Sequence, residues 1–145
     1  MGRGGMGAVY LAEDNRLKLL VALKILPASL GANAEGVRRF RQEARAASAI
    51  SHPNVAHIYE FGEEAKRYFL AMEYVEGKTL RELLREKSID RSRALKIAIQ
   101  IADALAATHK CGIVHRDIKP ENILVTENDL VKTQSFRIFK IAIQK

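Results

Sequence analysis

The sequence predicts an α+β fold, with a small antiparallel sheet and one helix in the first half of the chain and mainly helices in the second half. Two observations carry this prediction. Apolar and polar residues alternate with a period of two in short segments before residue 75, and apolar residues recur at helical spacing between residues 79 and 110. With 145 residues, the chain is long enough to form one domain with its own core.

Two strands are predicted near the start of the chain. Residues 8–11 form the first, and residues 21–26 form the second, which Pro27 ends. In the second strand, alternation places Val21, Leu23 and Ile25 on one face and Ala22, Lys24 and Leu26 on the other. A lysine in an apolar strand costs free energy unless it is paired or reaches water. Lys24 is therefore either a functional residue or a lysine at a sheet edge whose ammonium group is solvated.

One helix and two more strands complete the first half. Residues 35–50 are predicted to be helical, with an apolar stripe made by Phe40, Ala44, Ala47 and Ile50. Glu43 lies beside this stripe, and a glutamate on a solvated helix face is one interpretation of it. The strands at residues 55–61 and 67–74 are joined by a polar turn at residues 62–66.

Two helices are predicted after these strands. Residues 79–86 form a short one. Asp90 is the expected N-cap of a long one that ends near Lys110, with Gly112 as its stop. The buried stripe of the long helix is predicted to comprise Leu95, Ala98, Ile101, Ala102 and Leu105.

The chain is basic, with 24 Lys and Arg against 17 Asp and Glu, a formal net charge of +7 and a pI of about 9.7. Residues 78–96 carry much of this excess. A patch for nucleic acid or anionic lipid is one interpretation. Solvated helix faces, together with cations for bound phosphates, are favoured because no aromatic residues are interleaved with the charge. No nucleic-acid partner is therefore expected.

No targeting or membrane-spanning segment is expected in this sequence. The longest apolar stretch, residues 94–107, is interrupted by Lys96, Gln100 and Asp103 and so does not suit a bilayer. The N-terminus lacks the charged-then-apolar order of a signal peptide. The single cysteine, Cys111, suits a reducing compartment, so a cytoplasmic location is the simplest expectation.

Residues 115–124, HRDIKPENIL, contain the polar groups that phosphoryl transfer requires. Pro120 disfavours helix at Lys119, so the segment is predicted to be extended there. The transfer needs a carboxylate for the incoming hydroxyl, a cation for the phosphate and oxygen ligands for Mg²⁺. Asp117, Lys119 and Asn122 could take these roles in that order.

The same segment resembles the catalytic loop of protein kinases. HRDIKPEN matches the family pattern HRDLxxxN, with Ile118 in place of leucine. The lysine at position 119 resembles the residue pattern of the serine/threonine branch of the family. The N-terminus resembles the family's glycine-rich loop GxGxxGxV, whose backbone can fold closely over phosphates. The matching residues are Gly2, Gly4, Gly7 and Val9, and Gly5, within the same loop, is a further candidate to contact the nucleotide. A dinucleotide-binding turn would instead need a strand before the glycines and a helix after them.

The resemblance also implies a role for the strand lysine. VALK at residues 21–24 is similar to the family's VAIK motif, which places Lys24 against the α- and β-phosphates of ATP and Ala22 at the nucleotide. Glu43 resembles the helix glutamate that pairs with that lysine, and the HPN turn at residues 52–54 also resembles the family. At about 4 Å and an effective dielectric near 20, such a pair has about 4 kcal/mol of Coulomb attraction before desolvation is subtracted.

The remaining ATP contacts are implied by the same resemblance. Met72 would be the gatekeeper residue, and the backbone carbonyl of Glu73 and the backbone N–H of Val75 would bind adenine. Thr79 would approach the ribose, and Leu124 would lie under the adenine.

The metal site departs from the family pattern. The family expects a DFG motif, and the register of KTQSFRIFK assigns Ser135 and Arg137 to its aspartate and glycine positions. Serine has no negative charge to hold Mg²⁺, and Arg137 adds a cation nearby, which leaves Asn122 as the metal ligand. Because each 1.4 kcal/mol or so is a factor of ten in rate, turnover is expected to fall by about a thousandfold or more.

The resemblance covers nearly the whole chain, whereas the chain covers roughly half of the family domain. Residues 1–74 are expected to form an N-lobe without its first strand, residues 75–78 a hinge, and residues 79–145 an incomplete C-lobe. Residues 94–107 would pack inside the missing part and are therefore an expected association surface. Kinases of this type are often tethered, so the cytoplasmic part of a membrane-tethered protein is also compatible with the sequence.

The expected function is that of a serine/threonine protein kinase fragment that uses ATP and Mg²⁺ and transfers the γ-phosphate to Ser or Thr hydroxyls of protein substrates. Asp117 would position the hydroxyl, Lys119 and Lys24 would stabilise phosphate charge, and Asn122 would hold the metal. The alternative is a pseudokinase, a non-catalytic module that binds nucleotide or another protein. An incomplete gene remnant without a stable fold is the third interpretation.

Overall fold

A computed structural model describes residues 8–115 and 118–134, which fall into two compact units. The sheet unit contains the described residues 8–49 and 57–74. The helical unit contains residues 50–56 and the described part of residues 75–134. The short segment 50–56 therefore belongs to the second unit although the first unit precedes and follows it in sequence.

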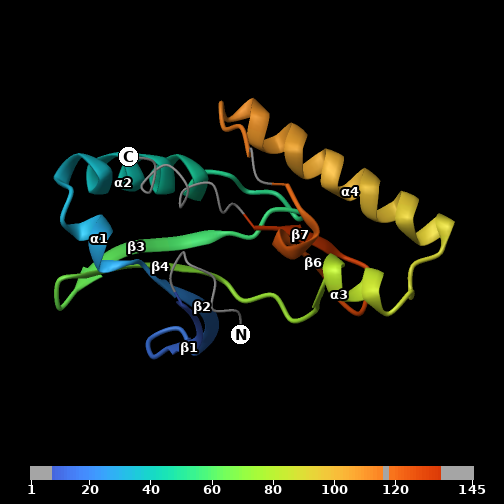
Figure 1. Ribbon diagram of the computed structural model, residues 1–145, viewed down its shortest axis with the longest axis horizontal. Coiled ribbons are helices and arrows are strands. Elements are labelled where there is room, and N and C mark those ends of the chain that lie inside the picture. The colour runs from blue at the N-terminus through green and yellow to red at the C-terminus, as the bar shows by residue number, and fades with distance from the viewer. Residues whose placement is uncertain (1–7, 116–117, 135–145) are drawn as a thin grey trace. The chain divides into compact units, whose positions relative to one another are not determined.

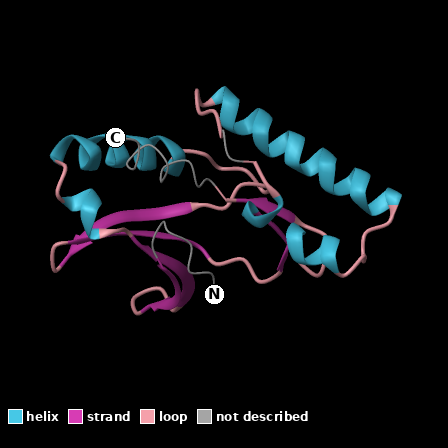
Figure 2. Cartoon of the chain, viewed as in Figure 1, coloured by secondary structure: helices cyan, strands magenta, loops and turns pink. Residues whose placement is uncertain are grey.

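The sheet unit is built on a four-stranded antiparallel sheet with the strand order β1-β2-β4-β3 (Figure 2). The strands are β1 (Ala8–Asp14), β2 (Leu19–Ile25), β3 (Ile58–Glu64) and β4 (Arg67–Glu73). Two helices, α1 (Ala28–Gly31) and α2 (Ala34–Ser48), follow β2. The Asn33 side chain caps α2 by accepting hydrogen bonds from the backbone N–H groups of Glu35 and Gly36, so the longer helix begins at a defined residue.

Helix α2 packs on one face of this sheet, beside β3 (Figure 1). Its buried residues are Val37, Phe40, Ala44 and Ala47, which confirms the predicted stripe except for Ile50, a residue of the helical unit. Phe40 packs against Phe61 of β3, with ring centroids 5.2 Å apart. Because Phe61 is paired with Leu70 in the β3–β4 register, α2 covers the sheet face that carries Leu70.

The boundaries of β3 differ from the predicted ones. The strand begins at Ile58, not at Val55, because Val55 lies in a turn and forms an isolated parallel bridge with Thr133. The predicted polar turn at residues 62–66 is also too long. The strands continue to a two-residue turn at Ala65 and Lys66, which have φ values of 49° and 60°. A hairpin turn with positive φ at both positions matches the twist of the strands it connects.

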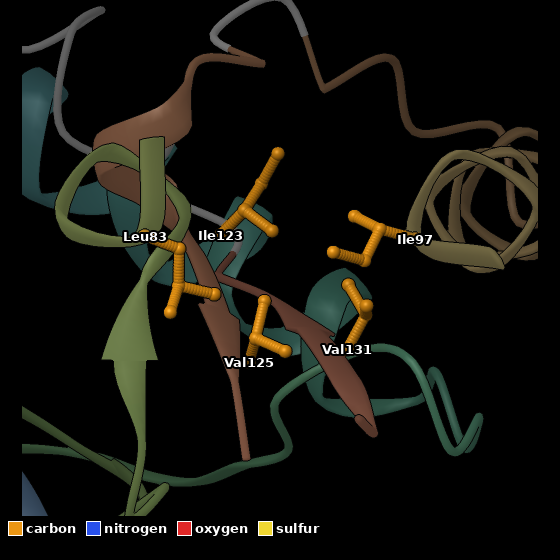
Figure 3. Close-up of a cluster of buried hydrophobic side chains, with 5 residues drawn as sticks. All are labelled: Leu83, Ile97, Ile123, Val125 and Val131. Atoms are coloured by element: carbon orange, nitrogen blue, oxygen red, sulfur yellow. The ribbon is translucent and has the colours of Figure 1, made fainter. Parts of the chain in front are cut away.

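The helical unit combines a small antiparallel sheet, in the order β5-β6-β7, with two helices. Its elements are β5 (Lys78–Thr79), α3 (Leu80–Arg85), α4 (Arg91–Lys110), the 3-10 turn η1 (Pro120–Asn122), β6 (Ile123–Val125) and β7 (Val131–Thr133). One buried apolar cluster joins α3, α4, β6 and β7. Figure 3 shows its members pointing toward one another: Leu83, Ile97, Ile123, Val125 and Val131.

Helix α4 begins and ends where the sequence predicts. Asp90 accepts a hydrogen bond from the Arg93 N–H at 2.7 Å, and Gly112 follows the helix with a φ of 73°. The predicted buried stripe is wrong for most of its members, because α4 buries Ile97, Ala104 and Thr108, whereas of the predicted residues Ile101 is half-buried and packs against the core cluster. Leu95 is 63% exposed, so the face assigned to the core points largely to solvent. Over the described residues, no helix, α4 included, combines the length and the hydrophobicity needed to cross a bilayer.

Gln100 explains why the stripe was assigned to the wrong face. Its side-chain oxygen accepts hydrogen bonds from the Val131 N–H and from the Asn54 side-chain amide, each at 2.9 Å. Its own amide donates to the Asp129 carbonyl at 2.8 Å. A polar residue that seems to interrupt the apolar pattern is thus part of the packed side of the helix, with its hydrogen bonds satisfied.

Candidate active site

Four residues predicted to contact ATP lie on one face of the sheet unit. Directly opposed residues of an antiparallel pair share a face, and the register pairs Val9 with Lys24 and Ala22 with Met72. Since Ala22 and Lys24 are two residues apart on β2, all four side chains point to the same side of the sheet, which is the side that α2 covers. Ala22, Lys24 and Met72 are buried, and Val9 is half-buried.

Lys24 is enclosed by protein, with 4% of its surface exposed. It lies on β2, between β1 and β4, so the interpretation as a solvated lysine at the sheet edge is wrong. Burial disfavours the charged ammonium and lowers the pKa of Lys24 from 10.5 to about 8. Near neutral pH the face therefore carries one buried cation. A buried, shifted lysine is the kind of group that marks a functional site.

Glu43 lies on α2 at the margin of the helix face that packs on the sheet. It is half-buried and comes one helical turn after Phe40 and one turn before Ala47, both of which are buried. The helix that carries Glu43 therefore covers the sheet face that carries Lys24. This arrangement is compatible with the predicted ion pair between the two residues, which stays a prediction.

The two backbone groups predicted for adenine follow each other closely in sequence. The Glu73 carboxylate accepts a hydrogen bond from the His57 N–H at 3.0 Å, and the Glu73 N–H donates to the His57 carbonyl at 2.8 Å. These bonds fix the end of β4. Within the described ranges, the N–H of half-buried Val75 makes no hydrogen bond, so this donor is available to a ligand.

In the helical unit, Lys119 and Asn122 belong to one short segment with a defined backbone. Lys119 is extended, with φ −155° and ψ 156°, as Pro120 predicts, and its carbonyl accepts the Asn122 N–H at 2.9 Å. Asn122 is buried and Lys119 is half-buried. The cation and the amide predicted to act together are therefore held three residues apart by a single 3-10 turn.

Gln134 is bonded to this segment at two places. Its carbonyl lies 2.8 Å from Nε2 of buried His115, and its N–H donates to the Asn122 carbonyl at 3.0 Å. The end of β7 is thereby held next to His115 and Asn122. The residue that directly precedes Ser135 consequently lies next to the predicted metal ligand.

Thr79 and Leu124 are paired in the β5–β6 register and share the face of the small sheet opposite to the buried Val125. The Thr79 hydroxyl caps α3, because it accepts the Glu82 N–H at 3.2 Å while the Glu82 carboxylate accepts from the Thr79 N–H and hydroxyl. These hydrogen bonds lower the pKa of Glu82. This capping box is an unpredicted feature of the chain, although the spacing T-x-x-E is its signature.

Several predicted site residues lie outside the residues that the structure describes. They are Gly2, Gly4, Gly5, Gly7, Asp117, Ser135 and Arg137. Within the described ranges, no three His, Cys, Asp or Glu side chains come together as a metal site. Mg²⁺ often binds through one or two protein ligands, with water and substrate phosphates completing its shell. The amide oxygen of Asn122 is a hard ligand that suits this role.

A family model described as the protein kinase domain matches residues 1–142. The chain belongs to the protein kinase family. The kinase chain is 47% identical over 139 residues to the serine/threonine-protein kinase PrkC of Bacillus subtilis and 45% identical over 141 residues to a probable serine/threonine-protein kinase of Clostridium perfringens. These alignments cover 95% and 97% of this chain but 22% and 21% of the relatives, so the chain spans about a fifth of their length.

Solved structures confirm the kinase fold. The crystal structure of the PknI kinase domain of Mycobacterium tuberculosis is similar with a TM-score of 0.84 and 29% sequence identity. The match covers 97% of this kinase chain and 57% of the PknI chain. The predicted α+β, kinase-like fold is therefore correct, and protein kinases in general use ATP and Mg²⁺ and act on proteins.

Proposed function

We propose that this chain carries the ATP-binding and phosphate-transfer residues of a serine/threonine protein kinase, acting on Ser or Thr hydroxyls of protein substrates. The observation that carries the proposal is the burial of Lys24 on the sheet face shared with Val9, Ala22 and Met72. Three small or apolar side chains suit the flat adenine ring and the sugar, and one cation suits the phosphates. A buried cation interacts more strongly with a phosphate than an exposed one does, because water screens it less.

In the sheet unit, Lys24 holds the α- and β-phosphates and Glu43 positions the Lys24 ammonium. The glycines at positions 2, 4, 5 and 7 fold over the phosphates. The Glu73 carbonyl and the Val75 N–H bind adenine, and the absence of a hydrogen bond to the Val75 N–H within the described ranges supports this role. In the helical unit, Leu124 lies under adenine. A contact between Thr79 and the ribose would require its hydroxyl to be shared with Glu82.

For the transfer itself, Asp117 positions the attacking hydroxyl and accepts its proton, while Lys119 stabilises charge on the transferred group. Asn122 supplies one oxygen to Mg²⁺. The metal, when bound, neutralises charge on the phosphates. The extended backbone at Lys119 and the turn that follows it support a concerted role for this segment.

A non-catalytic, nucleotide-binding role is the second candidate, and one observation favours it. Gln134 is bonded to both His115 and Asn122, and the next residue in sequence, Ser135, is the one assigned by its motif register to the metal-binding aspartate of DFG. A neutral serine there, with Arg137 close in sequence, weakens metal binding. We therefore propose that turnover is about a thousandfold or more lower than it would be with aspartate at position 135.

The remaining parts of the proposal concern organisation. We assign residues 1–74 to an N-lobe, 75–78 to a hinge and 79–145 to a partial C-lobe. The exposed side of α4 within residues 94–107, where Leu95 and Ile99 are more than half exposed, is the proposed association surface. An ATP-dependent enzyme with one cysteine suits the cytoplasm, whether free or tethered.

Binding of MgATP to the full chain, measured by calorimetry, tests the nucleotide site. Lys24→Met should weaken binding by about tenfold or more, because it removes a buried cation from the phosphates, whereas the control Lys96→Met on the exposed side of α4 should not. Equal affinities for the unchanged chain and Lys24→Met would refute the assignment.

Phosphate transfer from radiolabelled ATP to a generic basic protein tests catalysis separately. Any incorporation should disappear in Asp117→Asn. Ser135→Asp should strengthen the Mg²⁺ dependence of nucleotide binding and raise turnover. If Ser135→Asp changes neither quantity, its assignment to the metal site is wrong.

A further inference from the structure

The helical unit has a surface pocket of about 530 Å³ that the nucleotide proposal does not use. Leu83 of α3 and Val125 of β6, two members of the buried cluster in Figure 3, contribute the apolar part of its lining. Further lining comes from the stretch around Gly77, from the start of α4 and from the β6–β7 turn. The pocket is thus formed by four segments that lie far apart in sequence.

This pocket lies on the opposite face of the small sheet from the proposed nucleotide contacts. Lys78 and Val125 are paired in the β5–β6 register and line the pocket, whereas the next pair, Thr79 and Leu124, points the other way. None of the residues assigned to ATP or to metal lines the pocket. A ligand bound there would leave the proposed nucleotide contacts of this unit uncovered.

Two ion pairs fix the walls of the pocket before any ligand binds. Lys78 contacts both carboxylate oxygens of Glu86 at 2.9 Å. Arg93 binds the Asp129 carboxylate through Nε at 2.9 Å and Nη2 at 2.8 Å, and it also donates to the Ser88 carbonyl. Arg93 therefore connects α4 to the β6–β7 turn and to the α3–α4 connection. A preformed site of this kind loses little entropy when a ligand binds.

The charges that remain give the pocket a negative surplus. Both cations in its lining, Lys78 and Arg93, are neutralised by the ion pairs just described. Glu76 and Glu127, by contrast, are exposed lining residues that form no ion pair or hydrogen bond within the described part of the chain. The exposed cations Arg85 and Lys87 are close in sequence but do not line the pocket.

We propose that this pocket is a docking site for a short segment of a partner protein in which a Lys or Arg stands next to an aliphatic residue. The aliphatic side chain contacts Leu83 and Val125, and the basic side chain lies between Glu76 and Glu127. Charge complementarity selects this occupant over an acidic segment, since both pocket cations already have carboxylate partners. The proposal does not depend on whether the chain transfers phosphate.

Fluorescence anisotropy with the full chain tests the proposal. The probe is a fluorescein-labelled, amidated peptide, Gly-Leu-Arg-Leu-Lys-Gly, which contains no hydroxyl side chain and so cannot be phosphorylated. Glu76→Gln and Glu127→Gln should each weaken binding about threefold, the size of a partly exposed ion pair, and the double variant about tenfold. Glu60→Gln, an exposed acid of the sheet unit, makes the same change in net charge and should leave binding unchanged.

Two further peptides complete the test. Replacing both basic residues of the probe with Glu should abolish binding, and replacing both Leu residues with Ser should weaken it about tenfold or more. Lys24→Met should bind the probe normally, which separates this site from the nucleotide site. Equal binding of the basic and acidic peptides, or an unchanged affinity in the Glu76→Gln, Glu127→Gln double variant, would overturn the proposal.

Discussion

Lys24 in the sheet unit and Asn54 in the helical unit are both buried polar side chains, at 4% and 6% exposure, but they affect stability in opposite ways. The Asn54 amide donates to the Gln100 side chain at 2.9 Å and to the Val131 carbonyl at 2.8 Å. Its backbone carbonyl accepts both the N–H and the hydroxyl of Thr133. Lys24 instead carries a charge whose desolvation lowers its pKa to about 8.

This difference separates a structural polar residue from a functional one. Asn54 has a neutral amide whose hydrogen bonds in the fold replace those it would make with water, so its burial connects elements without a charge penalty. Lys24 loses hydration as a cation, and its pKa is lowered because burial disfavours the charged form. A buried lysine with a lowered pKa is typical of a functional site, which agrees with the proposed contact between Lys24 and the phosphates of ATP.

Replacing Asn54 should have the largest effect on stability. Asn54→Ala removes two side-chain hydrogen bonds and leaves the buried Val131 carbonyl without this donor, so the free energy of unfolding should fall by about 4 kcal/mol. Urea unfolding followed by circular dichroism measures this change. Asn128→Ala, in the exposed β6–β7 turn, is the matched control and should cost well under half as much. Similar losses for both variants would show that Asn54 is not a structural connection.

Replacing Lys24 should change the free energy of unfolding in the opposite direction, toward greater stability. Below pH 8 the ammonium is charged in both the folded and unfolded chain, so the full desolvation cost is present. Between about pH 8 and 10.5 the folded state loses its proton before the unfolded state does, and the free energy of unfolding therefore rises with pH. Lys24→Met should stabilise the chain at pH 7 by up to about 3 kcal/mol and remove this rise. Lys96→Met should do neither, and a Lys24→Met chain less stable than the original would contradict the burial argument.

The next prediction concerns the buried face of α4, where an apolar side chain and not a polar one is replaced. Ile97→Ala should lower the free energy of unfolding by about 2 kcal/mol or slightly more, because Ile97 is 3% exposed in the core cluster. Leu95→Ala, at 63% exposure, should change it by about 0.5 kcal/mol or less. Both values come from urea unfolding. The reverse ranking would restore the stripe that the sequence predicted.

The pKa of Lys24 also predicts how nucleotide affinity depends on pH. ATP favours the charged ammonium, so above about pH 8 a proton must be taken up when ATP binds. The association constant should fall by up to about tenfold per pH unit there and should be nearly flat between pH 6.5 and 7.5. Calorimetry at several pH values measures it. Lys24→Met should bind weakly with no such dependence, and a decline of equal size in that variant would point to another group.

Removing the capping box of α3 should have the smallest effect on the free energy of unfolding. Thr79→Ala removes the hydroxyl that accepts the Glu82 N–H, so the free energy of unfolding should fall by about 1 kcal/mol. Thr79→Ser keeps the hydroxyl and should preserve most of that stability. If Thr79→Ser weakens stability as much as Thr79→Ala does, the methyl group and not the cap is responsible.

The sequence predicted features that depend on local pattern. The alternation around Lys24, the cap at Asp90 and the stop at Gly112 each follow from a few neighbouring residues, and each is present. Helix α1 was missed because a single short turn after Pro27 leaves too few residues to show a period. The buried face of α4 was wrong because both sides of this helix are rich in apolar residues, and Gln100 marks the packed side only through partners far away in sequence.

The candidate site was predictable where a motif defines it and not where packing does. Residues 119–122 have the extended-then-turn backbone that Pro120 predicts, and Ala22, Lys24 and Met72 share a face as the strand registers require. The docking pocket was not predicted, since its lining comes from four separate segments. The double role of Thr79 was also missed, because a residue's position in the family motif gives no information about its hydrogen bonds within the helix cap.

The assignment of residues 50–56 to the helical unit has a practical consequence for dividing this protein. A fragment starting at residue 75 would lack Asn54, the bridge from Val55 to β7, and the side chains of Ile50 and Val55 that cover Ala104. A fragment ending at residue 74 would keep those groups but would lack their packing and hydrogen-bonding partners in α4 and β7. Neither half can be obtained intact by cutting the gene at that junction, so a peptide spanning residues 50–56, added in trans, is what a split version of this chain would need.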